Sequence, residues 1–311
     1  MRKAFVESLC QVAHGNQRVL LLTGDLGFMA LEPFRTCFPG RFFNVGVAEQ
    51  NLVGMATGLA EAGFIPYAYS IATFASLRPF EFIRNGPAMH HLPVRIVGMG
   101  MGFEYGHAGP THHALEDVAV LRTLPAVTTV IPADSGQTRS AIEQTSVLEG
   151  PVYYSLGKDD HLTVSGLDGR FELGRIQMVR SGTDLAILSM GSITVEAVAA
   201  ADELAKRGIR ATVAVVSNFH PDPVEDLASL LSTVPHAITL EAQAASGGLG
   251  ALAGMVIASR GLGCRLWPLA VTQPPDGTSG SQRSCWSRHG LDRDAVVECG
   301  MMALGRRNGG G

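Results

Sequence analysis

Short apolar runs alternate with helical patterns along most of this chain, and this alternation restricts the fold more than any other feature of the sequence. In the first half, the apolar runs predict strands at 18–22, 42–45, 66–70, 94–99, 127–131 and 152–156. Amphipathic patterns between the runs predict helices at 49–61 and 79–89. Strands that alternate with helices are typical of a parallel sheet covered by helices on both faces, which predicts an α/β fold.

A second α/β unit follows a polar, glycine-rich segment that shows no clear periodicity. Its apolar runs predict strands at 185–190, 211–216, 236–241 and 265–271, with a helix at 194–207. We therefore expect a first domain at 1–157, a linker at 158–176 and a second domain at 177–311, and a length of 311 residues is typical of two domains.

Charge and cysteine usage exclude several classes of function. The net charge is −4 and no long basic run occurs, so neither nucleic acid nor an anionic membrane surface is expected as the main partner. The five cysteines are scattered, without metal-ligand spacing, and we interpret them as reduced thiols of a cytoplasmic protein. No apolar stretch reaches about 18 residues, so no transmembrane helix is expected.

One segment combines a strand, a glycine turn and an acid that opens an apolar helix: Phe-Phe-Asn-Val-Gly-Val-Ala-Glu-Gln-Asn at 42–51, with the acid at Glu49. An acid in the first turn of a helix is favourable in itself, because the helix dipole and the free backbone N–H groups stabilise it. From the spacing alone, that structural interpretation of Glu49 is the stronger one.

The segment also resembles the Gly-Ile-Ala-Glu-Gln signature of the pyrimidine-binding domain in transketolases and 1-deoxyxylulose-5-phosphate synthases. Further segments resemble that family in the same order along the chain: 22–27, 72–75, 80–85, Gly-Pro-Thr-His-His at 109–113, 130–134, Gly-Gly-Leu-Gly at 247–250, and 289–291. Each motif is weak alone, but their order and spacing together are specific. The resemblance implies two three-layer α/β domains, a parallel-sheet pyrimidine-binding domain followed by a C-terminal domain with a mixed sheet.

The resemblance implies thiamine diphosphate as the cofactor and assigns three residues to it. Glu49 is the expected catalytic acid, whose carboxyl group hydrogen-bonds N1′ of the aminopyrimidine and activates the cofactor. Phe74 is expected to stack on the same ring, and Asp25 to face the cofactor cleft. The alternatives are a core position for Phe74 and a helix-capping role for Asp25.

The same resemblance assigns four residues to the substrate. His112 occupies the family position that contacts substrate oxygens, and imidazole can donate or accept a proton near neutral pH. His107 and His113 flank it as substrate-binding candidates, and Lys158 stands near a phosphate-binding arginine of the family. The alternatives are loop hydrogen-bonding for the two flanking histidines and a solvated side chain for Lys158. The histidines lack ordered ligand spacing, so no metal is expected on them.

Two positions depart from the family pattern. Ala108 replaces an aspartate, Gly100 or one of its neighbours stands in place of a histidine, and both family groups read sugar hydroxyls. The departures put the ordinary pentose phosphates in doubt as substrates and favour a different donor sugar.

The family's other half binds the diphosphate and Mg²⁺ through a Gly-Asp-Gly segment and a downstream Asn. Gly24-Asp25-Leu26 with Asn51 is only an apparent counterpart of this pattern, because Asn51 lies inside the helix that begins at Glu49. We find no convincing set of oxygen ligands for Mg²⁺ in this sequence. We expect a diphosphate-binding partner subunit that supplies the Mg²⁺ ligands in an α2β2 assembly. The expected activity is transfer of a two-carbon ketol unit from a ketose or ketose phosphate to an aldehyde. A 1-deoxyxylulose-5-phosphate synthase, a 2-oxoacid dehydrogenase β subunit and a non-catalytic paralogue remain as alternatives. The glycines at 247–250 could bind an anion at a helix N-terminus, or serve only close packing.

Overall fold

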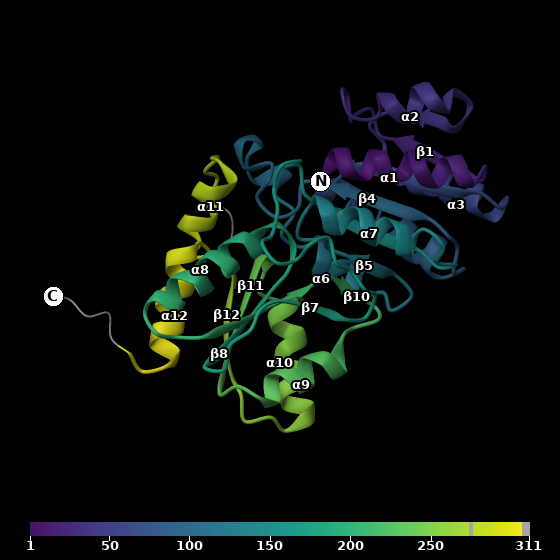
Figure 1. Cartoon of the computed structure of the whole chain (residues 1–311). Helices are drawn as coiled ribbons and strands as arrows, with labels where there is room; N and C mark the ends of the chain where they lie inside the picture. The colour runs from purple at the N-terminus through teal and green to yellow at the C-terminus, as the bar shows by residue number, and fades with distance from the viewer. Residues whose placement is uncertain (274–275, 307–311) are drawn as a thin grey trace.

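Two helix-covered sheets organise the residues that the computed structural model describes, 1–273 and 276–306 (Figure 1). Each sheet carries helices on both faces, so the predicted pair of three-layer α/β domains is confirmed. The last residues of the expected second domain, 307–311, lie outside the described ranges.

The first sheet has seven strands in the order β10-β5-β6-β4-β3-β1-β2. All neighbours are parallel except β10 and β5, which are antiparallel. In chain order the strands are β1 (Val19–Thr23), β2 (Phe42–Asn44), β3 (Ile65–Ile71), β4 (Arg95–Met99), β5 (Thr128–Val130), β6 (Val152–Leu156) and β10 (Asn218–Phe219).

Helices cover both faces of this sheet, and the burial pattern explains why the strands read as continuous apolar runs. One face packs against α1, α2 and α7, and the other against α3, α4, α5 and α6. In a strand that is buried on both faces, every side chain packs into a core, so apolar residues do not alternate with polar ones. The helices are α1 (Arg2–Gly15), α2 (Glu32–Cys37), α3 (Glu49–Glu61), α4 (Ala72–Ser76), α5 (Phe80–Ile83), α6 (Asp117–Arg122) and α7 (Ser135–Thr145). Four short helical turns accompany them: η1 (Pro39–Arg41), η2 (Arg84–Ala88), η3 (Gly106–Ala108) and η4 (Pro110–His112).

The helix predicted at 79–89 is divided in the structure. It begins as α5 and continues as the π-helical turn η2, with Pro87 inside. Proline has no N–H to donate and its ring displaces the preceding carbonyl, so a regular α-helix cannot continue through this position.

The second sheet has five strands in the order β12-β11-β8-β9-β7, of which only β7 and β9 are antiparallel neighbours. The expected mixed sheet is therefore present. Its strands are β7 (Ile176–Arg180), β8 (Leu185–Ser189), β9 (Ala211–Val216), β11 (His236–Ala244) and β12 (Arg265–Val271). The helical elements of this domain are η5 (Gly191–Ile193), α8 (Thr194–Lys206), α9 (Val224–Ser232), α10 (Leu249–Arg260), α11 (Gln282–Arg288) and α12 (Arg293–Ala303).

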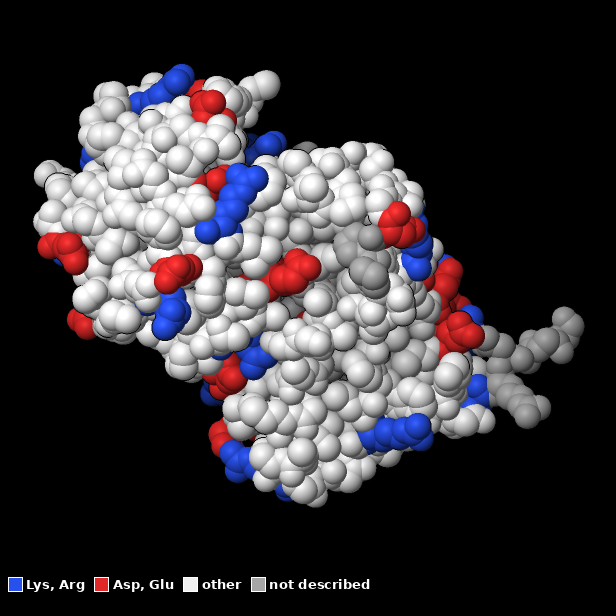
Figure 2. All heavy atoms as spheres, turned by 180° about the vertical axis from the view of Figure 1, so that it is seen from behind, with Lys and Arg blue, Asp and Glu red and all other residues white. Residues whose placement is uncertain are grey.

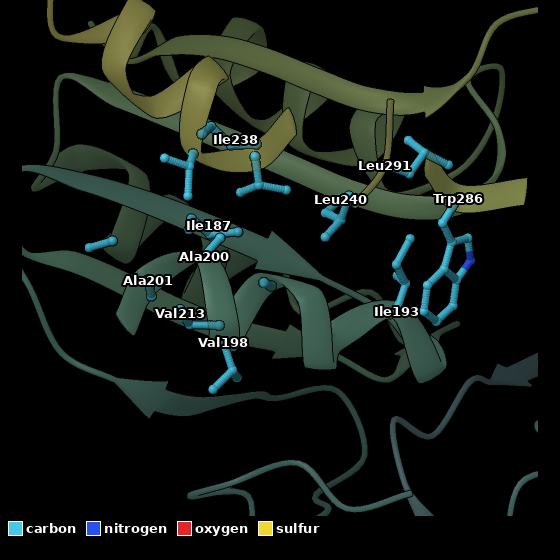
Figure 3. Packing of buried hydrophobic residues seen from close by; sticks show 14 of the residues in the cluster. Ile187, Ile193, Val198, Ala200, Ala201, Val213, Ile238, Leu240, Trp286 and Leu291 are labelled. Atoms are coloured by element: carbon cyan, nitrogen blue, oxygen red, sulfur yellow. The ribbon is translucent and has the colours of Figure 1, made fainter. Parts of the chain in front are cut away.

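The core of the second domain lies between this sheet and the group α8, α11 and α12 (Figure 3). There Trp286 of α11 is 2% exposed and packs in one cluster with Ile193, Leu240 and Leu291. Helices α9 and α10 close the opposite face of the sheet through a second cluster.

The two domains share structure, and the segment between them is packed. Strand β10 belongs to the second half of the chain but pairs with β5 of the first sheet. Between residues 158 and 176, Leu167 packs into the core of the second domain and Phe171 into that of the first. The Gln137 amide, on α7, donates to Ser217 Oγ at 2.9 Å across the boundary. The segment predicted as a linker is therefore an integral part of the interface.

Surface charge is dispersed on the face of the molecule shown in Figure 2, where basic and acidic side chains are interspersed among uncharged ones. Within the described ranges, no helix combines the length and the apolar character that crossing a bilayer requires.

Candidate active site at the carboxyl edge of the first sheet

Six side chains form a continuous row along the edge where the parallel strands of the first sheet end. The row follows the spatial order of the strands, because its members come from the segments after β2, β3, β4 and β6. Ligands of open α/β sheets bind at this edge. We call this set the edge row, and its successive contacts join Glu49, Arg78, Phe74, His112, Tyr105 and Lys158.

Glu49 is the first residue of α3, as the sequence predicts, and its side chain is only 2% exposed. Ser70 Oγ, near the end of β3, donates to Oε1 at 3.0 Å. Arg78 Nη1 donates to Oε2 at 2.9 Å, which completes an ion pair. The carboxyl group is therefore fixed by one hydroxyl group and one guanidinium group.

Phe74 lies beside this ion pair because α4 begins directly after β3 ends. The Arg78 Cζ atom is 3.8 Å from the centroid of the Phe74 ring, a cation–π contact. Phe74 also meets the His112 ring edge-on, with the centroids 5.1 Å apart. The predicted cofactor and substrate residues Glu49, Phe74 and His112 thus belong to one connected site.

His112 ends the short turn η4, which follows Gly109 with a φ of 83°. Glycine adopts this left-handed conformation without strain. The Thr111 hydroxyl and His112 Nδ1 are 2.9 Å apart and hydrogen-bonded. In the described part of the chain no hydrogen bond reaches Nε2, so this nitrogen is available to a ligand.

Tyr105 links His112 to Lys158 at the far end of the edge row. Its ring centroid is 6.2 Å from that of His112, and Lys158 Nζ is 3.9 Å from the Tyr105 centroid. Lys158 Nζ also donates to the Glu104 carbonyl at 3.0 Å. Burial, together with the nearby Arg2 cation, lowers the pKa of Lys158. The predicted phosphate-binding lysine therefore belongs to the edge row.

Gly100, one of the two positions that depart from the family pattern, lies against Tyr105 of the same loop. A Cβ atom on residue 100 would lie 2.2 Å from Cε2 of Tyr105. The Tyr105 ring thus fills the space that any side chain at position 100 would need. Ala108, the other departure, is exposed in η3.

Asp25 lies outside the edge row, on the loop after β1. Its side chain is exposed, its φ is 59°, and its carboxylate accepts from Asn44 Nδ2 at 2.8 Å. The neighbouring Gly24 is closer to the site, since a Cβ there would lie 3.9 Å from Glu49 Oε1. Asp25 is thus beside the site and braces the loop between β1 and β2. Its cofactor-binding role stays a prediction.

The other two histidines of the loop differ from His112. His107 is exposed in η3, whereas His113 is 5% exposed and packs edge-on against Phe103, with centroids 5.0 Å apart. Phe103 in turn stacks on His289 of the second domain at 5.0 Å. Burial and the nearby His289 lower the pKa of His113. The structure therefore gives His113 an interdomain packing contact, and the substrate roles of both histidines stay predictions.

Arg78, Tyr105 and Ser70 belong to this site, although sequence reasoning did not single them out. Ser70 is the last residue of a predicted strand, just before the turn that leads to Phe74. Its position at a strand end could have identified it as a candidate site residue. Arg78 falls between two predicted elements, and Tyr105 falls inside the motif loop. The sequence pattern gives no signal for the direction of either side chain.

The space for an anion beside the glycines at 247–250 is filled by a side chain of the protein itself. Glu241 of β11 accepts the backbone N–H groups of Leu249 and Gly250, at 2.9 and 2.8 Å, at the start of α10. A Cβ on Gly248 would lie only 1.8 Å from Glu241 Oε2. A carboxylate of the chain thus fills the helix N-terminus, and close packing explains the glycines. Among the described residues, no group of three or more His, Cys, Asp or Glu side chains could hold a metal ion.

Fold and site together define a two-domain α/β chain with a row of polar and aromatic side chains along the carboxyl edge of its first sheet. The model of the transketolase pyrimidine-binding domain matches residues 1–160, and that of the transketolase C-terminal domain matches residues 174–296. The chain therefore belongs to the transketolase family and corresponds to its C-terminal section.

Several relatives of the chain are subunits of divided transketolases. The chain is 30% identical to one subunit of the apulose-4-phosphate transketolase of Actinobacillus succinogenes, over 92% of each protein. It is 35% identical to a 6-deoxy-6-sulfo-D-fructose transketolase subunit of a Clostridium species, over 81% of this chain and 79% of the relative. A solved structure described as a split gene transketolase, inactive β4 tetramer, superposes with a TM-score of 0.87 at 33% identity and covers 98% of both chains.

A longer relative matches through only part of its length. The chain is 32% identical to the 1-deoxy-D-xylulose-5-phosphate synthase of Acidobacterium capsulatum over 80% of this chain but 40% of that enzyme.

Proposed function

We propose that this chain is the catalytic C-terminal subunit of a split, thiamine-diphosphate-dependent transketolase. Together with a diphosphate-binding partner subunit, it transfers a two-carbon ketol unit from a ketose or ketose phosphate to an aldehyde, in the transferase class of aldehyde and ketone groups. The observation that carries the proposal is that one flat group, the Arg78 guanidinium, contacts the buried Glu49 carboxyl group and the Phe74 ring at once. We call the place that this group occupies the slot.

The residues of this slot fit the aminopyrimidine of thiamine diphosphate. The Arg78 guanidinium group now fills it, with Nη1 2.9 Å from Glu49 Oε2 and Cζ 3.8 Å from the Phe74 centroid. This group is flat, stacks through its face and donates N–H from its edge, so it stands in for the N1′-protonated form of the ring, whose N–H would likewise donate to Glu49. A slot that accepts the guanidinium group offers the carboxyl contact and the ring face that the aminopyrimidine needs.

Four members of the edge row have a direct role in the proposal. Glu49 binds the ring nitrogen and manages its proton, and Phe74 supports the ring by stacking. His112 presents Nε2 to the substrate oxygens, and Lys158 attracts the anionic end of the substrate. When bound, the cofactor supplies the nucleophilic carbon that takes up the two-carbon unit.

The names of the relatives support a partner subunit and an unusual sugar substrate. One relative is named as a single subunit of an apulose-4-phosphate transketolase, and another acts on a sulfonated fructose by its name. Tyr105, which fills the space beside Gly100, would form part of the substrate wall. We propose an α2β2 assembly with the Mg²⁺ ligands on the partner. We also propose a cytoplasmic location, which the five free cysteines suit.

The test is ketol transfer by the chain mixed with a diphosphate-binding transketolase subunit from the same organism, thiamine diphosphate and Mg²⁺. We expect activity that needs both subunits, and a decrease of about 10²–10⁴-fold in kcat for Glu49→Gln, the range typical of general acid–base groups. Glu61→Gln, at the exposed end of the same helix, is the matched control and should retain the wild-type rate. Equal rates for Glu49→Gln and wild type would refute the proposal.

A second candidate, 1-deoxyxylulose-5-phosphate synthesis, is favoured by the match to that synthase. Pyruvate and glyceraldehyde 3-phosphate, offered to the same two-subunit mixture in place of a ketose donor, separate the two activities. Cofactor binding without turnover of any donor would instead favour the non-catalytic paralogue.

A further inference from the structure

Arg78 makes, in a single side chain, the two contacts that define the slot. Its Nη1 donates to Glu49 Oε2 at 2.9 Å, and its Cζ lies 3.8 Å from the centroid of the Phe74 ring. The edge of the guanidinium group therefore faces the carboxyl group while its face covers the phenyl ring.

An aminopyrimidine ring bound in the proposed way would need the same carboxyl oxygen and the same ring face. Two flat groups cannot share one face of Phe74 at van der Waals distance, nor one carboxyl oxygen along the same direction. The arginine and the ring are therefore mutually exclusive occupants of the slot.

We propose that Arg78 is an internal occupant of the pyrimidine slot, which it closes in the cofactor-free chain and vacates when the ring binds. This inference rests on the proposed function and adds a competing group of the protein to it. The regulated step is cofactor entry, because only the fraction of molecules with Arg78 outside the slot can accept the ring.

The arginine is the movable partner of this pair. Its side chain is 42% exposed and lies between the short helices α4 and α5, whereas the Glu49 side chain is 2% exposed and is also held by Ser70 Oγ at 3.0 Å. The exposed guanidinium group can therefore move into water while the carboxyl group stays in place, provided that the incoming ring takes over the contact with Glu49.

The Arg78–Glu49 ion pair also stabilises the cofactor-free chain. A buried carboxylate without a counter-charge is strongly unfavourable, and Arg78 supplies that charge while the ring is absent. The same interaction then competes with the cofactor, so the affinity for thiamine diphosphate is lower than the slot alone would give.

The test is isothermal titration calorimetry of thiamine diphosphate, with excess Mg²⁺, into the complex of the chain with its diphosphate-binding partner. Arg78→Gln should lower the dissociation constant by about tenfold or more, because the competing flat cation is gone. Arg260→Gln, which removes a comparable exposed arginine–glutamate pair from α10, should leave the dissociation constant unchanged. Arg78→Lys keeps a positive charge near Glu49 without the flat face, and should also bind the cofactor more tightly than the wild type.

A second measurement follows the side chain itself. In the wild-type complex labelled with ¹⁵N-arginine, one guanidinium signal that is absent from Arg78→Lys should move to the position of a solvent-exposed arginine when thiamine diphosphate is added. Weaker cofactor binding by Arg78→Gln, or an Arg78 signal that the cofactor leaves in place, would show that Arg78 is a ligand and not a competitor.

The inference and the proposed function fail in different ways. If thiamine diphosphate binds, and Glu49→Gln weakens it while Arg78→Gln does not strengthen it, the slot is a cofactor site and only the competition is wrong. If neither the wild type nor Arg78→Gln binds the cofactor in the presence of the partner, both are wrong.

Discussion

At the scale of single residues, buried charges explain most of the local arrangement. Glu49, Glu241 and Arg95 are each 2% exposed or less, and each is matched by a different kind of partner. Glu49 pairs with a movable arginine, Glu241 with the N-terminus of a helix, and Arg95 with backbone carbonyls. Of the three, only Glu49 is paired with an exposed side chain, which fits the proposed exchange of Arg78 for the cofactor ring.

Replacing Phe74 with alanine should weaken thiamine diphosphate binding to the two-subunit complex. A stacked ring contributes about 0.5–1.5 kcal/mol beyond its burial, so the dissociation constant should rise by roughly three- to tenfold or more. Phe82→Ala is the control, since that ring is 47% exposed and lies outside the edge row. Calorimetric titration of thiamine diphosphate into complexes of both variants compares their dissociation constants. Equal affinities would show that Phe74 is not part of the cofactor site.

Glu241 should make stability depend on pH. Burial raises its pKa to about 7, against the N–H donors of Gly250 and Leu249 and the nearby Arg122, which act in the opposite direction. Between the ordinary glutamate value of about 4.3 and 7, the folded chain holds a proton that the unfolded chain has released. The contribution of Glu241 to the free energy of unfolding therefore falls as pH rises through this window and is constant above it.

Urea unfolding of wild type and Glu241→Gln at pH 5 and pH 7.5 measures this contribution. The advantage of the wild type over the variant should be larger at pH 5 by roughly 2–3 kcal/mol. A constant difference between the two proteins at both pH values would mean that Glu241 does not titrate there.

At the scale of elements, single buried groups connect neighbouring segments. Arg95 begins β4 and is fully buried, with Nη1 donating to the Gly150 carbonyl at 2.6 Å and Nη2 to the Ser146 carbonyl at 3.2 Å and to that of Leu148. The acceptors lie at and beyond the C-terminal end of α7, where the helix dipole favours a cation. This arginine fixes the turn that leads from α7 into β6.

Arg95→Met should therefore reduce the free energy of unfolding by about 2–4 kcal/mol, because charged hydrogen bonds are lost and buried carbonyl groups are left without donors. Arg18→Met, at an exposed position before β1, should change stability by no more than about 0.5 kcal/mol. Denaturant titration of both variants compares them, and a loss below about 1 kcal/mol for Arg95→Met would contradict this role.

The elements that sequence reasoning predicted are those with strong local patterns. Helix α3 and strands β6, β9 and β12 have the predicted bounds, because an apolar run or stripe between glycines and polar residues defines each of them. Strand β10 was missed, since two residues carry no periodicity and their pairing depends on a distant strand. Strand β7 was missed because its alternating burial follows a glycine-rich stretch that reads as a linker.

The site was predictable only where a motif marks it. Glu49, Phe74 and His112 lie in motif segments, and the structure brings them into one row. Arg78 and Tyr105 could not be predicted, because their roles depend on side-chain directions that the tertiary structure decides. The contact of His113 with Phe103, which stacks on His289 more than a hundred residues away, is likewise a product of the domain interface.

At the scale of the whole molecule, the two domains depend on each other. Strand β10 extends the first sheet from within the second half of the chain, and Arg122 of α6 forms an ion pair with Asp222 at 3.5 Å. The Gln137 amide also donates to Gln177 Oε1 at 3.1 Å across the same boundary. The domain interface therefore stabilises both halves together.

The two domains should consequently unfold in one transition. Both tryptophans, Trp267 and Trp286, belong to the second domain, so their fluorescence reports on that domain alone. Far-ultraviolet circular dichroism reports on both. The two signals should give the same urea midpoint, whereas a second domain that unfolds at a separate midpoint would show that the interface is weak.

In the proposed function, the Glu49 carboxyl group activates thiamine diphosphate held between this chain and a partner subunit. The most direct measurement is the exchange of the cofactor C2 proton for deuterium, followed by quenched-flow ¹H NMR in the two-subunit complex with Mg²⁺ but without substrate. We expect fast exchange in the wild type and exchange slower by at least about a hundredfold in Glu49→Gln. Equal exchange rates in the two proteins would contradict the proposed function.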